Sequence, residues 1–456
     1  MIGTMNLQEI QTITGGVLSG DAAFSAVSID TRTLTSGDLF IALTGPNFNG
    51  NDYVEAAAKQ KACAAIVSEK VASTLPTLQV NDTRQALGAI GALNRSLSSA
   101  CVIALTGSQG KTSVKEMTAS ILSECGNVMM TQGNLNNDLG VPLSLARIEK
   151  DNEFAVIELG ANGPGEIAYT VGLTRPRIGH ITNIAGTHLE GFGDLEGVAK
   201  AKAEIWQGIE EGGIAVVNLD DAFAAQFIQE IGQQPGNRQV VTVSGSGNLN
   251  ADYRAVDIEL NKLQGVEFTL HAPEGSIPIQ LTVPGHHNVS NALAASALAM
   301  SAGAGLVQVK AGLEQFTPVK GRMCIVAGIQ GATIIDDTYN ASPSSFRAAI
   351  NVLVNSGGKT IVVMGDMGEL GTEEASAHRE IGLYAREQGV DEFIAVGELS
   401  RLASEAFGEN GIALESRDDF LASITTLLDN KTTVLVKGSR SQLMEKLVVQ
   451  IQAESE

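Results

Sequence analysis

The sequence is poor in aromatic residues, in cysteine and in positive charge. Phe, Trp and Tyr make up 4% of the 456 residues, and the four cysteines include no C-x-x-C pair. We therefore expect neither a structural zinc site nor a disulfide framework. Acidic residues outnumber basic ones by 51 to 30, which gives a formal net charge of −21. A surface of this sign disfavours nucleic acids, and we expect no nucleic-acid partner.

The chain also lacks a long apolar segment. No run of about eighteen apolar residues occurs, and residues 1–6 lack the basic and then apolar pattern of a signal sequence. We expect no insertion into a membrane and a location in the cytoplasm. The acidic surface is compatible with a monomer, which is the state that we expect.

One stretch has the pattern of a phosphate-binding loop. The apolar run 101–105 predicts a buried strand, Thr106-Gly-Ser-Gln-Gly-Lys-Thr112 follows it, and a helical pattern begins after Thr112. Such glycines let backbone N–H groups approach phosphate oxygens, Lys111 can reach the β- and γ-phosphates, and the Thr112 hydroxyl can ligate Mg²⁺. The common motif G-x-x-x-x-G-K-[ST] would place glycine at Leu105. A glycine turn that merely precedes Lys-Thr is the alternative, and the flanking strand and helix disfavour it.

The order of predicted strands and helices divides the chain into three α/β domains. A small N-terminal α/β domain covers 1–99, and a central domain with a P-loop ATPase-like, mostly parallel sheet covers 100–317. A C-terminal, Rossmann-like doubly wound domain covers 318–456. The central strands are expected at 101–106, 154–159, 178–184 and 213–219.

Three further segments complete this outline. Residues 94–99 are polar and are predicted to be a linker between the first two domains. Residues 240–283 alternate in hydrophobicity and predict antiparallel strands. An alanine-rich helix is expected over 292–302, and residues 284–291 lead into it.

Polar residues follow the predicted central strands. Glu158 ends one strand, and Asn183 and then His188 follow the next. Because ligands of open α/β sheets bind beyond the strand carboxyl ends, these residues can converge on the phosphate loop and hold a metal. A histidine in a loop is more often simply solvated. Lys202 lies in a helical pattern, where a solvated helix face is the simpler local interpretation.

Two other polar groups have both a structural and a functional interpretation. The pattern of a half-buried strand at 27–32 carries Ser28, Asp30 and Arg32, which could hold a sugar or base. An ordinary strand end with a solvated arginine is slightly preferred on local grounds. Asn288 and Asn291 lie three residues apart on one helix face, where they could cap the helix or pair with an adenine edge.

Taken together, these motifs resemble those of the Mur ligases, the ATP-dependent amide ligases of peptidoglycan synthesis. Their phosphate loop is shortened in the same way, which accounts for Leu105. The resemblance covers nearly the whole chain, and the matching segments are 106–112, 133–143, 158–160, 183–188, 201–205, 285–291 and 321–322.

The resemblance implies a role for each matching residue. Lys111, His188 and Lys202 would be catalytic, and two Mg²⁺ ions would be held by Thr112, Glu158, His188 and Lys202, with a carbamate on Lys202 as a hypothesis. ATP would be bound by Gly107, Ser108, Gln109, Gly110, Lys111, Thr112, Ser113, Asn288, Asn291, Arg322 and Asp337. The other substrates would be bound by Ser28, Asp30, Arg32, Asn134, Asn137, Asn340, Ser439 and Arg440.

Within the family, residues 336–343, 365–371 and 437–440 resemble a ligase that uses a dipeptide. The resemblance implies that D-alanyl-D-alanine is joined to UDP-N-acetylmuramoyl-tripeptide through an acyl phosphate, with release of ADP and phosphate. This step would serve the cell wall, cell shape and cell division. Residues 47–53 depart from the relatives' pattern in the UDP-sugar-binding domain. The Asp-Asn-Pro-Arg motif of diaminopimelate-adding relatives is absent.

Two alternatives remain open. One is another ligase of the same fold, either diaminopimelate- or lysine-adding, or similar to folylpolyglutamate synthetase. The other is a P-loop NTPase that binds partners and ligates nothing. Formation of ADP that depends on an amine substrate distinguishes a ligase from such an NTPase. The third residue of the tripeptide is open between lysine and diaminopimelate.

Overall fold

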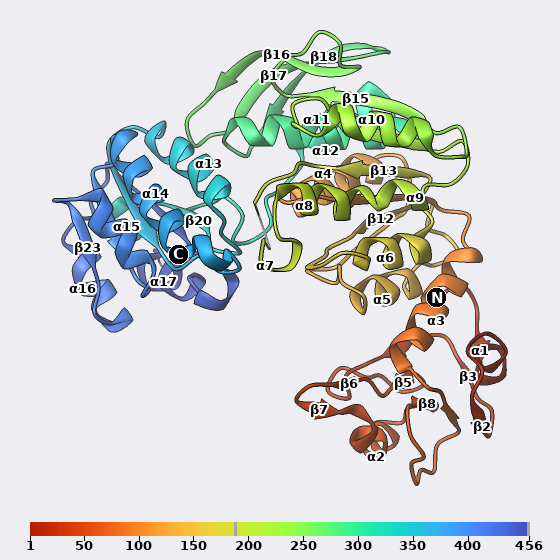
Figure 1. Ribbon diagram of the computed structural model, residues 1–456. Coiled ribbons are helices and arrows are strands. Elements are labelled where there is room, and N and C mark those ends of the chain that lie inside the picture. The colour runs from red at the N-terminus through yellow and green to blue at the C-terminus, as the bar shows by residue number, and fades with distance from the viewer. Residues whose placement is uncertain (187–188, 454–456) are drawn as a thin grey trace.

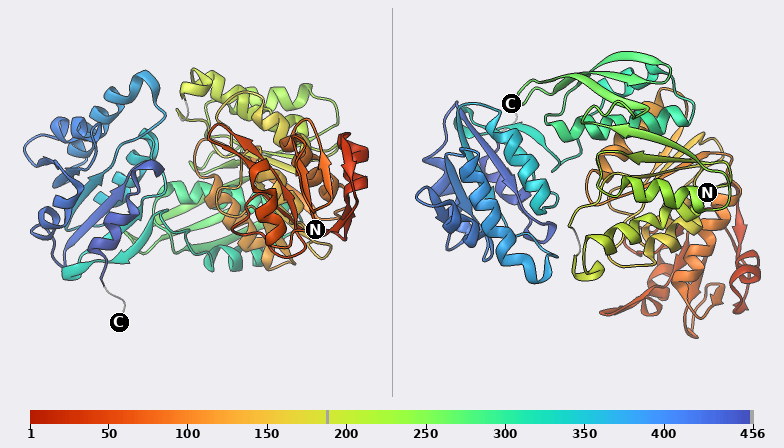
Figure 2. Two further views of the ribbon diagram at one scale, coloured as in Figure 1. Left: turned by 90° about the horizontal axis from the view of Figure 1, so that it is seen from below. Right: turned by 45° about the horizontal axis from the view of Figure 1, so that its top comes forward.

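The computed structural model describes residues 1–186 and 189–453. These residues form three α/β domains in chain order, each with its own sheet (Figure 1). Figure 2 shows the N-terminal and C-terminal domains at opposite ends of the molecule, with the central domain between them. Among the described residues, no helix is long and apolar enough to cross a membrane. The predicted class of three α/β domains is confirmed, and the boundaries after 99 and 317 stay predictions.

The N-terminal domain contains a five-stranded, mostly parallel sheet. Its elements are β1 (Met5–Asn6), α1 (Leu7–Thr14), β2 (Val17–Ser19), β3 (Ala23–Phe24), β4 (Val27–Ser28), β5 (Leu39–Ile41), β6 (Thr44–Gly45), β7 (Phe48–Asn49), η1 (Gly50–Tyr53), α2 (Val54–Lys59), β8 (Ala64–Val67), β9 (Thr77–Gln79) and α3 (Thr83–Ser96). The order in the sheet is β2–β9–β8–β5–β4, and only the edge strand β2 runs antiparallel to its neighbour.

The linker predicted over 94–99 is wrong, because α3 continues to Ser96 and packs against the central domain. Asn94 is fully buried, and its amide donates to the carbonyl oxygen of Leu145 at 2.8 Å. The guanidinium of Arg95 donates to the carbonyl oxygen of Thr174 at 2.9 Å. These polar side chains satisfy carbonyl oxygens of the neighbouring domain, so their polarity marks an interface and not a solvated connection.

The central domain is a nine-stranded sheet with helices on both faces. Its strands are β10 (Cys101–Thr106), β11 (Val128–Met130), β12 (Phe154–Glu158), β13 (Ile178–Ile181), β14 (Ile214–Asn218), β15 (Gln239–Ser244), β16 (Tyr253–Leu260), β17 (Val266–Ala272) and β18 (Gly275–Leu281). Its helices are α4 (Lys111–Ser123), α5 (Gly140–Ala146), α6 (Glu166–Thr174), α7 (Leu189–Phe192), α8 (Leu195–Ala203), α9 (Ile205–Gly208), α10 (Ala224–Gln233), α11 (His286–Ser301) and α12 (Leu306–Glu314).

The strand order explains why the central strands are apolar. It runs β11–β12–β10–β13–β14–β15–β16–β17–β18, and α4, α11 and α12 cover one face while α5, α6, α8, α9 and α10 cover the other. A strand buried on both faces carries a near-continuous apolar run. The four strands predicted near 101, 154, 178 and 213 are confirmed, each within a few residues of its predicted ends.

Two predictions for the second half of this domain need correction. The region 240–283 is not antiparallel throughout, because β15 is parallel to both β14 and β16 and only β16, β17 and β18 pair antiparallel. Helix α10 crosses over between β14 and β15, which lets the chain re-enter the sheet in the same direction. The helix predicted over 292–302 already begins at His286, directly after Gly285 with its positive φ of 98°.

The C-terminal domain is a six-stranded sheet in the order β19–β20–β24–β21–β22–β23, parallel except at β19. The elements are β19 (Cys324–Ala327), η2 (Ile329–Gly331), β20 (Thr333–Asp337), α13 (Pro343–Val354), β21 (Lys359–Met364), η3 (Gly371–Glu373), α14 (Glu374–Glu387), β22 (Glu392–Ala395), α15 (Ser400–Phe407), β23 (Gly411–Ala413), η4 (Arg417–Asp419), α16 (Phe420–Thr425), β24 (Thr432–Lys437), η5 (Arg440–Gln442) and α17 (Glu445–Ile451). Apolar cores on both faces confirm the doubly wound class.

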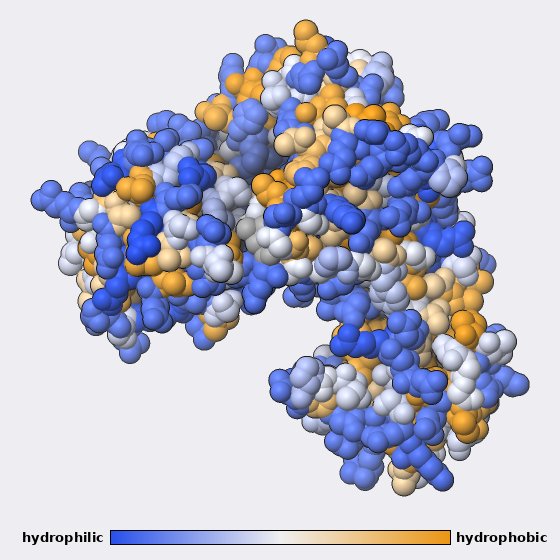
Figure 3. Space-filling view, in the orientation of Figure 1, coloured by the Kyte–Doolittle hydropathy of each residue, from blue (hydrophilic) through white to orange (hydrophobic). Residues whose placement is uncertain are grey.

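The three domains leave two different spaces between them. The C-terminal domain contacts the central domain along one side, and a wide open space separates it from the N-terminal domain (Figure 3). A cavity of about 500 Å³ lies where the central and C-terminal domains meet. It is lined by residues that follow the central strands β10, β12 and β13, which is the edge where open α/β sheets bind their ligands.

Candidate active site

The phosphate loop lies between β10 and α4, as its sequence predicts. Gly107 and Gly110 adopt positive φ angles of 141° and 75°. A Cβ atom at Gly107 would lie 2.0 Å from the Thr182 hydroxyl, and one at Gly110 would lie 2.6 Å from the Asn291 amide oxygen. Glycine is therefore needed here both for its backbone conformation and for space. The loop leads directly into the N-terminus of α4, where the helix dipole favours an anion.

Lys111 is the first residue of α4, and its side chain folds back over the loop. Its Nζ donates to the carbonyl oxygen of Gly107 at 2.8 Å. Burial lowers the pKa of Lys111, the nearby Glu158 carboxylate acts in the opposite direction, and Arg322 lowers it further. An ammonium group held over a glycine loop can contact the phosphate oxygens of a nucleotide.

The loop is bound to the end of the neighbouring strand β13. The backbone N–H of Ser108 donates to the carbonyl oxygen of Asn183 at 2.9 Å, and that of Gln109 donates to the Asn183 side chain at 3.1 Å. The Ser108 hydroxyl donates to the carbonyl oxygen of Ala185 and accepts from its N–H, both at 2.9 Å. These bonds fix the loop to the segment that leads to His188.

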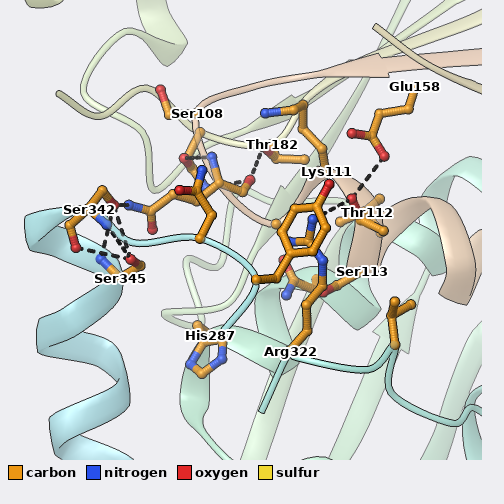
Figure 4. A pocket seen from close by; sticks show the side chains of 18 of the residues that line it. Ser108, Lys111, Thr112, Ser113, Glu158, Thr182, His287, Arg322, Ser342 and Ser345 are labelled. Carbon is orange, nitrogen blue, oxygen red and sulfur yellow. Dashed lines mark hydrogen bonds between the residues drawn. The ribbon is translucent and has the colours of Figure 1, made fainter. Parts of the chain in front are cut away.

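The side-chain oxygen atoms of Thr112 and Glu158 lie next to each other beside the loop (Figure 4). The Thr112 hydroxyl donates to Glu158 Oε2 at 3.0 Å, and the Asn136 amide donates to Oε1 at 2.8 Å. The Arg322 guanidinium donates to the Thr112 hydroxyl at 2.9 Å. Among residues 1–186 and 189–453, no group of three or more His, Cys, Asp and Glu residues is placed to hold a metal. A hydroxyl and a buried carboxylate are nevertheless the hard oxygen ligands that suit Mg²⁺.

Lys202 is buried beside this group and not on a solvated helix face. Its Nζ lies 3.4 Å from the carbonyl oxygen of Ala161 and 5.2 Å from the centre of the Phe192 ring. Burial is the main cause that lowers the pKa of Lys202 to about 7, and the positive charge of Lys111 contributes. The solvated alternative is therefore wrong for Lys202. His188, the other predicted residue of this group, lies outside the described residues.

The C-terminal domain forms the opposite wall of the cavity. Asp337, at the end of β20, forms a 2.5 Å ion pair with Lys437, at the end of β24. Lys437 also donates to the carbonyl oxygen of Asn340 at 2.9 Å. The Arg322 guanidinium stacks over the Tyr339 ring, 4.1 Å from its centre. A buried ion pair thus lies in the wall that the C-terminal domain contributes, and the stacked Arg322 guanidinium reaches from this wall to Thr112 of the phosphate loop.

The phosphate loop also contacts the C-terminal domain directly. The Gln109 amide donates to the hydroxyl of Ser342 at 2.8 Å and to that of Ser344. Ser342 is the N-cap of α13, and Pro343 is the first residue of this helix, as predicted. Gln109 therefore connects the loop to the start of α13 across the boundary between the two domains.

Asn288 and Asn291 lie within the first turns of α11. The Asn288 amide donates to the carbonyl oxygen of Pro284 at 2.8 Å, and the Asn291 amide donates to the Asn288 side chain at 3.1 Å. His287 lies beside them, and burial lowers its pKa to about 4. Both asparagines line the cavity near the loop, and their hydrogen bonds to each other and to Pro284 orient their side-chain amides.

The structure brings most predicted residues to one cavity. The predicted residues that line it are Ser108, Gln109, Gly110, Lys111, Thr112, Ser113, Asn134, Asn137, Glu158, Asn288, Asn291, Arg322, Asp337 and Asn340. Gly107 and Lys202 lie next to it and do not line it.

Ser439 and Arg440 lie outside the lining of this cavity. The Ser439 hydroxyl donates to the carbonyl oxygen of Asp366 at 2.7 Å. Arg440 forms a 3.0 Å ion pair with Glu445 and is partly exposed. Their predicted contact with a substrate stays a prediction.

Ser28, Asp30 and Arg32 form a separate group in the N-terminal domain. The strand predicted over 27–32 is only β4, because the Ser28 hydroxyl donates to the carbonyl oxygen of Asp30 at 3.0 Å and the chain turns there. Arg32 and Asp30 form a 2.7 Å ion pair, in which the Arg32 side chain is 87% exposed. Hydrogen bonds from Arg32 lower the pKa of Asp30. Arg32 is exposed, Asp30 is half-buried and Ser28 is buried, and none of the three lines the cavity.

Sequence reasoning gave no individual role to several residues that line the cavity, among them Asn136, Thr182, His287 and Lys437. Asn136 lies in the same segment as the predicted Asn134 and Asn137, but only the structure shows that its amide bonds Glu158. Lys437 is the last residue of a strand, and a lysine there is usually solvated. Its pairing with Asp337 joins residues from two strands, which no local pattern predicts.

Comparison with known proteins places this site in a family. Three family models match the chain: Mur ligase family, catalytic domain, over 23–95; Mur ligase middle domain, over 105–299; and Mur ligase, glutamate ligase domain, over 321–440. The chain is 44% identical over 452 residues to UDP-N-acetylmuramoyl-tripeptide–D-alanyl-D-alanine ligase of Escherichia coli (strain K12), covering 98% of each.

Solved structures agree in fold. MurF from Acinetobacter baumannii is 36% identical, with a TM-score of 0.91 and 98% of both chains covered. MurF ligase from Thermotoga maritima in complex with ADP is 26% identical, with a TM-score of 0.82 over 93% of this chain and 96% of that one. Because all three domains are matched, and because the relatives align over nearly their full length, this chain belongs to the Mur ligase family.

Proposed function

We propose that this protein is an ATP-dependent ligase that joins D-alanyl-D-alanine to UDP-N-acetylmuramoyl-tripeptide and releases ADP and phosphate. The observation that carries the proposal is the 44% identity to the Escherichia coli ligase of that name over 98% of both chains. The site supports it, because the cavity combines a phosphate loop with polar groups from a second domain. The reaction would take place in the cytoplasm, where ATP is available, and would serve peptidoglycan synthesis.

The nucleotide would bind across the cavity. The loop from Gly107 to Ser113 would hold its phosphates, with Lys111 contacting the β- and γ-phosphates. Asn288 and Asn291 would contact the adenine, and Arg322 and Asp337 would contact a phosphate and the ribose. The ADP complex of the Thermotoga maritima relative supports a nucleotide in this fold. Asp337 would then exchange part of its ion pair with Lys437 for a ribose hydroxyl.

The chemistry would be phosphoryl transfer followed by amide formation. The terminal carboxylate of the tripeptide attacks the γ-phosphorus of ATP, and ADP leaves. The amine of the dipeptide attacks the resulting acyl carbon, loses a proton, and phosphate leaves. The protein would act mainly by positioning and by charge, since Lys111 and Arg322 place positive groups where phosphate oxygens gain charge.

Mg²⁺ would be held by Thr112 and Glu158, with His188 and Lys202 at a second position. When bound, the ions would neutralise phosphate charge and orient the oxygens that react. The buried carboxylate of Glu158 supports the first position, because its oxygen ligands suit a hard cation. Arg322 would then release the Thr112 hydroxyl, whose oxygen it occupies in the present arrangement.

A carbamate on Lys202 would turn this lysine into an anionic ligand. Carbon dioxide reacts with a neutral amine, and a pKa of about 7 leaves much of the Lys202 amine neutral near pH 7. The lysine is also buried, so a positive charge without an anion beside it is costly. Both features support the modification.

The other two substrates would be held by the outer domains. The UDP-sugar would contact Ser28, Asp30 and Arg32 in the N-terminal domain, and its peptide would pass Asn134 and Asn137. The dipeptide would lie near Asn340, Ser439 and Arg440. The wide space between the outer domains is consistent with a long substrate that spans them (Figure 3).

An assay of ADP release tests the proposal. ADP should form only when ATP, UDP-N-acetylmuramoyl-tripeptide and D-alanyl-D-alanine are all present, with lysine- and diaminopimelate-containing tripeptides tested in parallel. Diaminopimelate, lysine and glutamate should not replace the dipeptide as amine. ADP release that needs no amine would favour a plain NTPase, and release with glutamate and a folate would favour a folylpolyglutamate synthetase-like ligase.

A further inference from the structure

His378 is a buried histidine that the proposed chemistry does not use. It lies on α14 with none of its surface exposed. Its Nε2 accepts a hydrogen bond from the backbone N–H of Met367 at 2.9 Å. Its Nδ1 lies 2.6 Å from the carbonyl oxygen of Glu374, one turn earlier on the helix. The ring therefore joins α14 to the glycine-rich segment that follows β21, residues 365–371.

These two partners determine the protonation state of the ring. A backbone N–H can only donate, so the Nε2 that faces Met367 must carry a lone pair. A carbonyl oxygen can only accept, so the Nδ1 that faces Glu374 must carry the hydrogen. His378 is thus neutral and has its proton on Nδ1. A second proton would set Nε2–H against the Met367 N–H and remove this hydrogen bond.

The segment that His378 holds forms part of the cavity wall. Gly368, Glu369 and Leu370 line the cavity, and the Met367 side chain is fully buried in the domain core. Further anchors of this segment precede the bond to His378: the N–H of Gly365 donates to the carbonyl oxygen of Lys437 at 2.8 Å, and Asp366 makes several hydrogen bonds.

Asp366 holds the segment through both its backbone and its side chain. Its carbonyl oxygen accepts from the N–H and from the hydroxyl of Ser439, at 2.9 and 2.7 Å. Its carboxylate accepts from the N–H of Ser400 at 2.7 Å. The segment therefore also holds Ser439, which belongs to the predicted dipeptide site.

We infer that His378 is a positioning residue that, as the neutral Nδ1-protonated imidazole, holds segment 365–371 against the cavity, and that protonation of the ring releases this segment. That His378 holds segment 365–371 follows from the fold alone, whereas its effect on the affinity for the dipeptide rests on the proposed function. In this role His378 acts through the segment and does not itself contact a substrate.

The charges around the ring are compatible with a neutral state near pH 7. Burial is the largest effect and lowers the pKa of His378, while the hydrogen bond to the Glu374 carbonyl oxygen and the carboxylates of Asp366 and Glu374 partly oppose it. Helix α15 packs against α14 near Gly382 with the uncharged residue Ala403. On α13, Arg347 is paired with Glu380, on the exposed side of α14. Release is therefore expected only in acid.

Nitrogen NMR of the wild-type chain tests the protonation state without any substrate. At about pH 7.5 we expect the His378 ring to show a protonated Nδ1 and an unprotonated Nε2, assigned by the loss of these signals in His378→Gln. A protonated Nε2, or a charged ring at this pH, would overturn the inference.

Hydrogen exchange tests the hold on the segment. In His378→Leu, the amides of 367–371 should exchange about tenfold faster, since one lost hydrogen bond of about 1.4 kcal/mol corresponds to that factor. The amides of β21 should be unchanged. His378→Gln keeps one acceptor and should lie between the wild type and His378→Leu, and His271→Gln, on β17 of the central domain, is the matched control. Unchanged exchange at 367–371 in a folded His378→Leu would contradict the hold.

Kinetics connect the hold to the site. His378→Leu should raise KM for D-alanyl-D-alanine about tenfold and leave KM for ATP within about twofold. Equal changes in both would indicate a general structural defect and would refute the positioning role. If the wild type shows no dipeptide-dependent ADP release, the proposed function fails, and the NMR and exchange results still decide the role of His378.

Discussion

At the scale of single residues, the burial of two lysines defines the chemistry of the site. Lys111 and Lys202 come from different helices. Burial is the main cause that lowers the pKa of each, and the positive charge of Lys111 lowers the pKa of Lys202 further. A lysine whose ammonium form is disfavoured binds an anion tightly or reacts as the neutral amine. The two lysines therefore have different expected roles, Lys111 as a phosphate contact and Lys202 as a modified ligand.

For Lys111 we expect a loss of phosphoryl transfer. Lys111→Ala should reduce kcat for ADP release by about 10²–10³-fold with all substrates present, because it removes a charge that the transition state needs. Lys150→Ala, on an exposed turn, is the control. Thermal unfolding should confirm that both variants are folded. Turnover retained in Lys111→Ala would refute the phosphate-loop assignment.

For Lys202 we expect dependence on carbon dioxide. Activity of the wild type should fall in buffer depleted of bicarbonate and recover when it is added back, whereas Lys202→Ala should be weakly active and insensitive to bicarbonate. Lys200→Ala is the matched control, since Lys200 lies on the same helix and is exposed. A carbamate signal in ¹³C NMR with labelled bicarbonate should be present only in the wild type and Lys200→Ala. An identical response of wild type and Lys202→Ala would exclude the carbamate.

At the scale of elements, the phosphate loop connects strand β13 of the central domain to helix α13 of the C-terminal domain. Asn183 and Thr182, after β13, hold the backbone of Gln109, and the Gln109 side chain reaches the N-cap of α13. Any shift of the loop would therefore be transmitted through Gln109 to the start of α13. The contact is one physical link between nucleotide binding and the placement of the C-terminal domain.

Gln109→Ala should weaken this link without removing the loop. We expect the C-terminal domain to sample wider positions, measured as a larger radius of gyration in X-ray scattering. KM for the dipeptide should rise by about threefold to tenfold, which is the size expected for one or two hydrogen bonds. Gln85→Ala, on the N-terminal helix α3, serves as the control. An unchanged scattering profile together with unchanged KM would argue against the link.

Helix α3 shows the same principle at the other boundary. Its last turn carries Asn94 and Arg95, which bind carbonyl oxygens of the central domain. Arg84, in its first turn, adds a 2.7 Å ion pair to Asp138. One helix thus joins the two domains through contacts in both its first and its last turn, and these contacts place the N-terminal domain against the central one.

At the scale of the whole molecule, stability should depend on pH through buried histidines. Burial lowers the pKa of both His180 and His287 to about 4, from an ordinary value of 6.5. Between these values the unfolded chain binds protons that the folded chain does not. The contribution of these histidines to the free energy of unfolding should therefore be fully present above about pH 6.5. The free energy of unfolding should decrease as the pH falls toward 4.

Denaturant unfolding from about pH 7 to 4.5 measures this slope. We expect the slope to be shallower in His180→Leu, because one proton-binding group is removed from the unfolded chain. His286 is exposed, so His286→Gln should leave the slope unchanged and serves as the control. His378, whose pKa is also lowered by burial, adds to the slope in the same direction. If the slope does not change in His180→Leu, the pKa of His180 is the same in the folded and the unfolded chain, and the expectation is wrong.

Much of the fold could be predicted, and the failures have a common cause. The runs at β10, β12, β13 and β14 are apolar because both faces are covered, so they are legible in the sequence. The pattern at β15 predicts a strand in the right place but the wrong, antiparallel pairing, because its partner β14 lies across a helical crossover. Asn94 and Arg95 were read as a linker because a polar side chain that binds carbonyl oxygens of another domain looks, in sequence, like one that binds water.

The same division holds for the site. The local order of strand, glycines, lysine and hydroxyl determined the phosphate loop from sequence alone, because backbone conformation and helix start are local properties. Only the tertiary structure decided that Asn136 meets Glu158, that Asp337 pairs with Lys437, and that Gln109 reaches α13. These contacts join residues distant in the chain, and their existence depends on how two domains pack. The sequence by itself determined which groups exist and in what local form, and packing determined which of them meet.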